Sequence, residues 1–144
     1  MPLKLKLAAH EQLVVNGAVM INGEYRTTLL IRNFAHILRE KDVLQHRQAD
    51  TPTKLLYFQV QAMLLAQPPA PPALLDEYDR QLALLRIAYT DPGHRDMLDE
   101  VDRLVGAGDH YKALRQLQPL IAIEAGLLNR APPHWRRAAV AAAG

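Results

Sequence analysis

The chain of 144 residues contains no cysteine and no serine. Without cysteine there are no disulfide bridges, thiolate metal sites or cysteine nucleophiles, and this composition is typical of a reducing compartment. Without serine there is no serine nucleophile. No apolar run reaches the roughly 18 residues of a membrane-spanning helix. The first seven residues alternate charged and apolar types, unlike an export signal, so we expect a cytoplasmic protein that does not enter the membrane.

Motifs for catalysis or metal binding are missing as well. The glycine-rich phosphate loops, the dinucleotide fingerprint and the G-x-S-x-G elbow do not occur. The six histidines are never three or four residues apart, as helical metal ligands would be. Acidic residues gather at 76–79 and 96–102, where helix dipoles and a solvated helix face account for them. We therefore expect neither an enzyme, nor a cofactor, nor a metal site.

Charge is distributed unevenly, although the net charge is only +2. Residues 1–56 hold eight Lys and Arg against five acids, a balance of +3. Residues 57–129 hold six against ten, a balance of −4, and residues 130–144 hold three Arg and no acid. A basic front suggests an anionic partner, and a solvated surface of mixed sign explains the same numbers.

Two Asn-Gly dipeptides, Asn16-Gly17 and Asn22-Gly23, dominate the front of the chain. Asn-Gly accepts the positive φ of a tight hairpin turn, so each dipeptide predicts a hairpin. A strand that alternates leucine and lysine is predicted before them. The four strands expected here are 3–7, 12–15, 18–21 and 24–32. Residues 34–38 fit a fifth strand followed by a turn or a short helical turn, and periodicity does not decide between these readings.

Helical periodicity begins at Asp50-Thr51-Pro52, where a capping residue precedes a proline suited to the first helical turn. The prolines at 68–72 predict a break and a stiff connector. A second helix is expected along the apolar stripe from Leu75 to Tyr89, and further helices from Asp91-Pro92 and from Asp109. Pro119 should kink or split the last one.

The predicted fold class is α+β, a small N-terminal antiparallel β-meander of about four to five strands followed by about four helices. We expect a basic β-meander module at 1–50 and a helical part at 51–129, joined through the connector Pro68–Pro72. Residues 130–144 are expected to form a flexible Ala/Pro/Arg tail.

Candidate binding residues lie in the front of the chain, because basic groups follow phosphates and aromatic rings stack on unpaired bases. The register of the strand 24–32 would place Arg26 and Arg32 on the face opposite Leu29 and Ile31. Phe34, Tyr57 and Phe58 are expected in the core. The candidate RNA-binding residues are Lys4, Lys6, Tyr25, Arg26, Arg32, Arg39, Lys41, Arg47 and Lys54.

A succession of short motifs carries a resemblance to a known family. Residues 13–23, with their two Asn-Gly turns, lead to Leu38-Arg39-Glu40-Lys41-Asp42, then to Ala49-Asp50-Thr51-Pro52 and Leu56-Tyr57-Phe58. This order resembles FlbT, the bacterial flagellum biosynthesis repressor family, over roughly residues 1–128. The resemblance implies a small cytoplasmic regulator that associates with the 5′ untranslated region of flagellin mRNA, lowers its translation and hastens its decay.

A second hypothesis is a protein-interaction adaptor. Here the acidic, amphipathic helices after Pro72 would bind a flagellin, its chaperone or another flagellar regulatory protein. The open edges of a short meander also predict a homo-oligomer.

Overall fold

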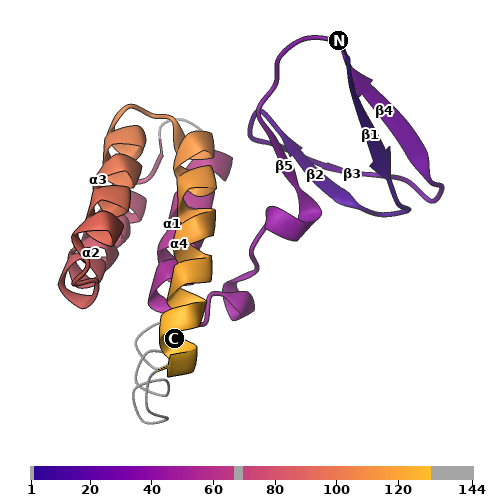
Figure 1. The fold of residues 1–144 in the computed structure, drawn as a ribbon. Coiled ribbons are helices and arrows are strands. Elements are labelled where there is room, and N and C mark those ends of the chain that lie inside the picture. Colours follow the sequence, from indigo (N-terminus) through magenta and orange to yellow (C-terminus); the bar gives the residue numbers. More distant parts are fainter. Residues whose placement is uncertain (1, 67–69, 131–144) are drawn as a thin grey trace. The chain divides into compact units, whose positions relative to one another are not determined.

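The structure, a computed structural model, describes residues 2–66 and 70–130 (Figure 1). Its residues divide into two compact units, one ending at Val43 and the other starting at Leu44. Within the described residues, the first unit holds five antiparallel strands and the second holds four α-helices. The α+β class and the order of strands before helices are confirmed.

The strands form two small sheets. β1 (Leu3–Leu7) pairs with β4 (Thr27–Ile31), and β2 (Gln12–Val15) lies between β3 (Ala18–Ile21) and β5 (Ile37–Arg39). All pairs are antiparallel. The segment after residue 33, which periodicity alone leaves open, thus contains a short strand, and a 3-10 turn, η1 (Glu40–Asp42), follows it.

The first Asn-Gly dipeptide forms the predicted hairpin. Asn16 and Gly17 have φ values of 49° and 84° and join β2 to β3 as a two-residue loop. The Asn16 side chain also accepts a hydrogen bond from the His36 amide at 2.8 Å, which ties this loop to the segment before β5.

The second Asn-Gly dipeptide does not form a hairpin, so that prediction is wrong. β3 pairs with β2 alone, and β4 begins at Thr27 and ends at Ile31 rather than spanning 24–32. The Asn22 side-chain amide instead donates to the carbonyls of Ala8 at 2.8 Å and Tyr25 at 2.9 Å. These bonds direct the chain across to β1. β4 then pairs with β1, and Leu29 packs against the apolar core.

The core of the first unit is small. Leu5, Leu7 and Leu13 are buried at its centre, and partly buried apolar side chains surround them. β1 supplies the first two of these leucines because its odd-numbered residues face inward, as the alternation of leucine and lysine predicts. The surrounding side chains are those of Val15, Leu29, Ile31 and Ile37.

Four helices make the second unit, and a 3-10 turn, η2 (His46–Gln48), precedes them. The helices are α1 (Pro52–Leu65), α2 (Pro72–Ala88), α3 (Pro92–Gly106) and α4 (His110–Arg130). The first three begin with a proline at the first helical turn, and side chains at Thr51 and Asp91 cap α1 and α3 as predicted. α1 packs against α2 and α4, and α3 packs against α4.

Pro119 lies inside α4, which continues past it to Arg130. The helix is therefore not split there, and the alternative, a kink, stays a prediction. Pro119 and Arg115 are exposed. The Arg115 carbonyl, which loses its helical donor at the proline, can therefore bind water instead. Pro68 and Pro69 of the predicted connector lie outside the described residues, as does the predicted tail from residue 131 on.

A buried polar cluster joins three of the helices. The Thr53 amide donates to Glu124 Oε2 at 2.9 Å, and the Thr53 hydroxyl lies 2.7 Å from the Tyr89 hydroxyl. All three side chains are buried. Burial raises the pKa of Tyr89 to about 12. Glu124 in α4 thus satisfies an amide in the first turn of α1, which has no partner within its own helix.

Nothing in the described helices has the length and apolarity that crossing a membrane requires.

Candidate nucleic-acid interface

The pairing of β1 with β4 creates a two-stranded ribbon with one solvent-exposed face. The register sets Lys4 opposite Leu30 and Lys6 opposite Thr28, so these four side chains share the face turned away from buried Leu5. We call this set the ribbon face: Lys4, Lys6, Thr28 and Leu30. All four residues are exposed, and neither lysine forms an ion pair with any described residue.

Two arginines lie just beyond the ends of β4. Arg26 precedes the strand and Arg32 follows it, and both are exposed. Neither forms an ion pair within the part of the chain that the structure describes. Leu30, which is 59% exposed, lies directly opposite Lys4 and diagonal to Lys6. The sequence already marks this residue, because Leu30 is an apolar residue on the otherwise polar face of the strand's alternation.

Exposed aromatic rings lie in the connections on either side of β4. Tyr25 is 79% exposed, as expected for a candidate stacking residue. Phe34 is 82% exposed, so its expected place in the core is wrong. Its ring meets that of His36 edge-on, with centroids 4.9 Å apart. Phe34 falls in an irregular segment between β4 and β5, where no strand turns it inward. Tyr57 is buried and Phe58 half-buried in α1, in line with a core role.

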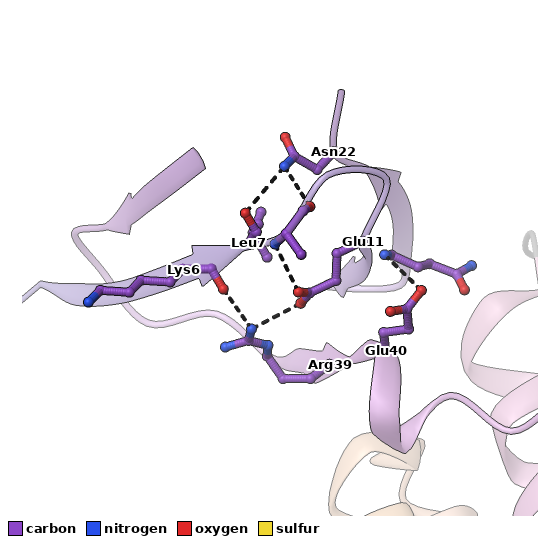
Figure 2. Close-up of polar contacts among 8 residues, drawn as sticks. Lys6, Leu7, Glu11, Asn22, Arg39 and Glu40 are labelled. Atoms are coloured by element: carbon purple, nitrogen blue, oxygen red, sulfur yellow. Dashed lines mark hydrogen bonds and ion pairs between the residues drawn. The ribbon is translucent and has the colours of Figure 1, made fainter. Parts of the chain in front are cut away.

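Arg39 is bonded within the first unit, and its side chain is 34% exposed. Its Nη2 atom donates to the Lys6 carbonyl and to Glu11 Oε2, both at 2.9 Å (Figure 2). Glu11 Oε1 also accepts the Ala8 amide at 3.1 Å. These bonds from Ala8 and Arg39 lower the pKa of the Glu11 carboxyl. Arg39 thus links β5 of one sheet to β1 of the other.

Glu40 adds a second polar link in the same region, since its Oε1 atom accepts the Gln12 amide at 3.3 Å (Figure 2). Sequence reasoning missed the parts played by Glu11, Asn22 and Glu40, because each bonds to residues that are distant in the chain and no local motif marks such contacts.

The other three candidates lie outside β1 and β4 in the chain. Lys41 is exposed in η1. Arg47 and Lys54 belong to the second unit, and Lys54 in the first turn of α1 pairs at 3.2 Å with Asp50, which precedes the helix. The structure therefore groups Lys4 and Lys6 with their neighbours on β4.

Several cations of the second unit form ion pairs with acids of the same unit. Arg86 bonds to Asp99 and lies 3.6 Å from Asp102, and Arg103 pairs with Glu100 at 2.5 Å. These pairs leave an excess of acid on its surface, which disfavours phosphate. Across the described residues, no group of three or more metal-ligating side chains comes together.

The fold and the ribbon face define a small α+β protein whose strand unit presents cations and exposed aromatics. The family model described as flagellar protein FlbT matches residues 3–128. The chain belongs to the FlbT family. No solved structure matches it.

Curated relatives agree with this assignment. The "probable flagellum biosynthesis repressor protein FlbT" of Rhodopseudomonas palustris strain TIE-1 is 39% identical over 131 residues, covering 90% of this chain and all of the relative. The "flagellum biosynthesis repressor protein FlbT" of Caulobacter vibrioides strain CB 15 is 36% identical over 124 residues, covering 86% of this chain and 87% of the relative. The expected resemblance to this family is confirmed.

Proposed function

We propose that this chain represses flagellin expression in the cytoplasm by binding the 5′ untranslated region of flagellin mRNA. The repressor role rests on the FlbT relatives, whose names describe them as repressors of flagellum biosynthesis. The ribbon face is the observation that supports RNA as the ligand. Lower translation and faster decay of the message would follow from occupation of its leader.

The chemistry of the ribbon face suits a nucleic-acid strand. Lys4 and Lys6 project from the same face about 6.6 Å apart along β1, at about 3.3 Å per residue. Neither has an internal ion pair among the described residues, so both ammonium groups are available to phosphates. Leu30, directly opposite Lys4, offers apolar contact, and the exposed Tyr25 ring offers a surface on which a base can stack.

Single-stranded or looped RNA is the form that this surface fits. An A-form duplex hides its base edges in a deep, narrow major groove, whereas unpaired bases can splay onto aromatic and apolar side chains. The exposed Phe34 ring, beyond the other end of β4, extends the stacking surface. Because Arg39 already bonds Glu11 and the Lys6 carbonyl, we assign it to the support of this surface rather than to RNA contact.

The test is the affinity of the RNA-free protein for the flagellin leader RNA, measured by fluorescence anisotropy across a salt series. Lys4→Ala combined with Lys6→Ala should weaken binding at least about tenfold and reduce the salt slope by about 0.7 for each phosphate that is no longer neutralised. The matched control combines Arg80→Ala with Lys112→Ala, which removes two exposed cations from the second unit and should leave binding unchanged. Salt-independent binding, or equal affinity for both double variants, would contradict the proposal.

One observation supports the adaptor hypothesis. On α2, Leu84 is 57% exposed and Ile87 is 74% exposed, one turn apart on the outer side of the helix. Such an apolar pair could receive a flagellin or another flagellar regulatory protein. A stoichiometric complex of RNA-free protein with flagellin, lost in Leu84→Asp with Ile87→Asp and kept in Lys4→Ala with Lys6→Ala, would favour this alternative.

A further inference from the structure

β3 is an edge strand without the usual protection. All four of its residues are exposed, including Val19 at 48%, Met20 at 43% and Ile21 at 70%. Among the strands of the described residues, β2 is its one partner. Monomeric proteins normally guard such an edge with lysine, proline or a bulge. From Gln12 to Gly23 the chain has neither a charged residue nor a proline.

The other strand edges of this unit do carry charge. β1 bears Lys4 and Lys6, and Arg26 and Arg32 flank β4. β5 ends in Arg39, which is engaged by Glu11. A second copy approaching β1 or β4 would bring like charges together, whereas β3 could meet its own copy without that cost.

The β2–β3 register shows which backbone groups are free. A two-residue loop makes Val15 and Ala18 a hydrogen-bonded pair, and such pairs alternate along an antiparallel ladder. Leu13 and Met20 form the next bonded pair, and the bond from the Asn22 amide to the Glu11 carbonyl at 2.9 Å continues the series. The N–H and C=O groups of Val19 and Ile21 therefore point away from β2.

We propose that β3 pairs with β3 of a second copy of this chain, antiparallel and about a two-fold axis at Met20. In this register Val19 lies opposite Ile21 of the second copy, and Met20 lies opposite itself. The outward N–H and C=O groups of Val19 and Ile21 then form four hydrogen bonds, and the two three-stranded sheets become one of six strands. The contact is isologous, so it closes at two copies.

The size of the contact sets its strength. Four residues from each copy bury less than the roughly 800 Å² per partner of a standard stable interface. We therefore expect a dimer with a dissociation constant on the order of micromolar that exchanges with monomer. This inference does not depend on RNA binding.

Sedimentation of the RNA-free protein tests the proposal between about 0.01 μM and about 100 μM. The protein should pass from monomer to dimer across this range. Because Met20 faces its own copy, Met20→Lys alone and Met20→Glu alone should each weaken dimerisation at least about tenfold, through two like charges placed opposite each other. An equal mixture of the two variants should restore a dimer that contains one chain of each.

Leu84→Lys is the matched control, since it makes the same kind of change on exposed α2 and should leave dimerisation intact. If circular dichroism shows that a Met20 variant is unfolded, Ile21→Lys takes its place, at a side chain with still less packing to lose. A monomer at every concentration, a dimer that tolerates the folded edge variants, or a dimer broken by Leu84→Lys would overturn the proposal.

Discussion

Arg39 illustrates at the scale of single residues what charge in a sequence does and does not reveal. Its type and its basic surroundings predict a phosphate contact. In the structure its guanidinium is 2.9 Å from both the Lys6 carbonyl and Glu11, 28 residues earlier in the chain. Lys4 and Lys6 could be assigned correctly to a wet face because alternation along one strand is local. The contacts of Arg39 could not be predicted from the sequence, because they depend on which strands pair.

The pairing of Glu11 with Arg39 makes the stability of the strand unit depend on pH. The pKa of Glu11 in the folded protein lies below its ordinary value of 4.5, because the Ala8 amide and Arg39 favour the carboxylate. A carboxyl group with a lowered pKa stabilises the fold above its unfolded pKa, and this contribution is lost as pH falls through the folded pKa. Glu11→Gln should therefore be less stable than the unmodified chain at pH 7, and this difference should vanish in acid.

Urea unfolding at a series of pH values measures this difference directly. Glu24→Gln is the control, because Glu24 is exposed and forms no hydrogen bond or ion pair within the described residues. Its difference from the unmodified chain should stay constant with pH. A constant difference for Glu11→Gln as well would show that the pair adds nothing to stability.

At the scale of elements, the helices were predictable because their signals are local. A cap, a proline and a stripe of period 3.6 locate α1 and α3 at their observed starts. Strand existence was also predictable, but strand pairing was not. The dipeptides at 16 and 22 look alike in sequence, yet only the first adopts positive φ and turns the chain back. The conformation at the second dipeptide depends on the carbonyls to which the Asn22 side chain donates once the sheets have assembled.

The two glycines of these dipeptides should respond differently to substitution. Gly17 has a φ of 84°, which an alanine adopts only with strain, so Gly17→Ala should lower the free energy of unfolding by about 1–2 kcal/mol. Gly23 is outside the positive-φ region, and a Cβ added there would meet no atom within 4 Å. Gly23→Ala should change stability by no more than about 0.5 kcal/mol. Chemical denaturation of both variants compares them, and equal losses would contradict the observed turn.

At the scale of the whole molecule, the division at Val43 predicts units that lose stability separately. Glu124→Ala removes the acceptor of the Thr53 amide and leaves a buried donor without a partner, at a cost of about 1–3 kcal/mol. Amide hydrogen exchange should then show faster exchange in the helices, with β1 and β4 unchanged. Glu124→Gln keeps an acceptor oxygen and should cost less. Equal acceleration in both units would indicate that the chain unfolds as one body.

The link between Glu124 and Thr53 spans 71 residues, and this distance orders the events of synthesis. All five strands lie within the first 43 residues. The Thr53 amide in the first turn of α1, in contrast, gains its acceptor only when Glu124 of α4 has been made. At about 5–20 residues per second, the roughly 80 residues between Val43 and Glu124 take about 4–16 s to make. For those seconds the nascent chain carries a complete ribbon face and an unfinished helical unit. A ribosome-bound chain that ends before α4 should therefore present its lysines in their final arrangement while its helices remain open.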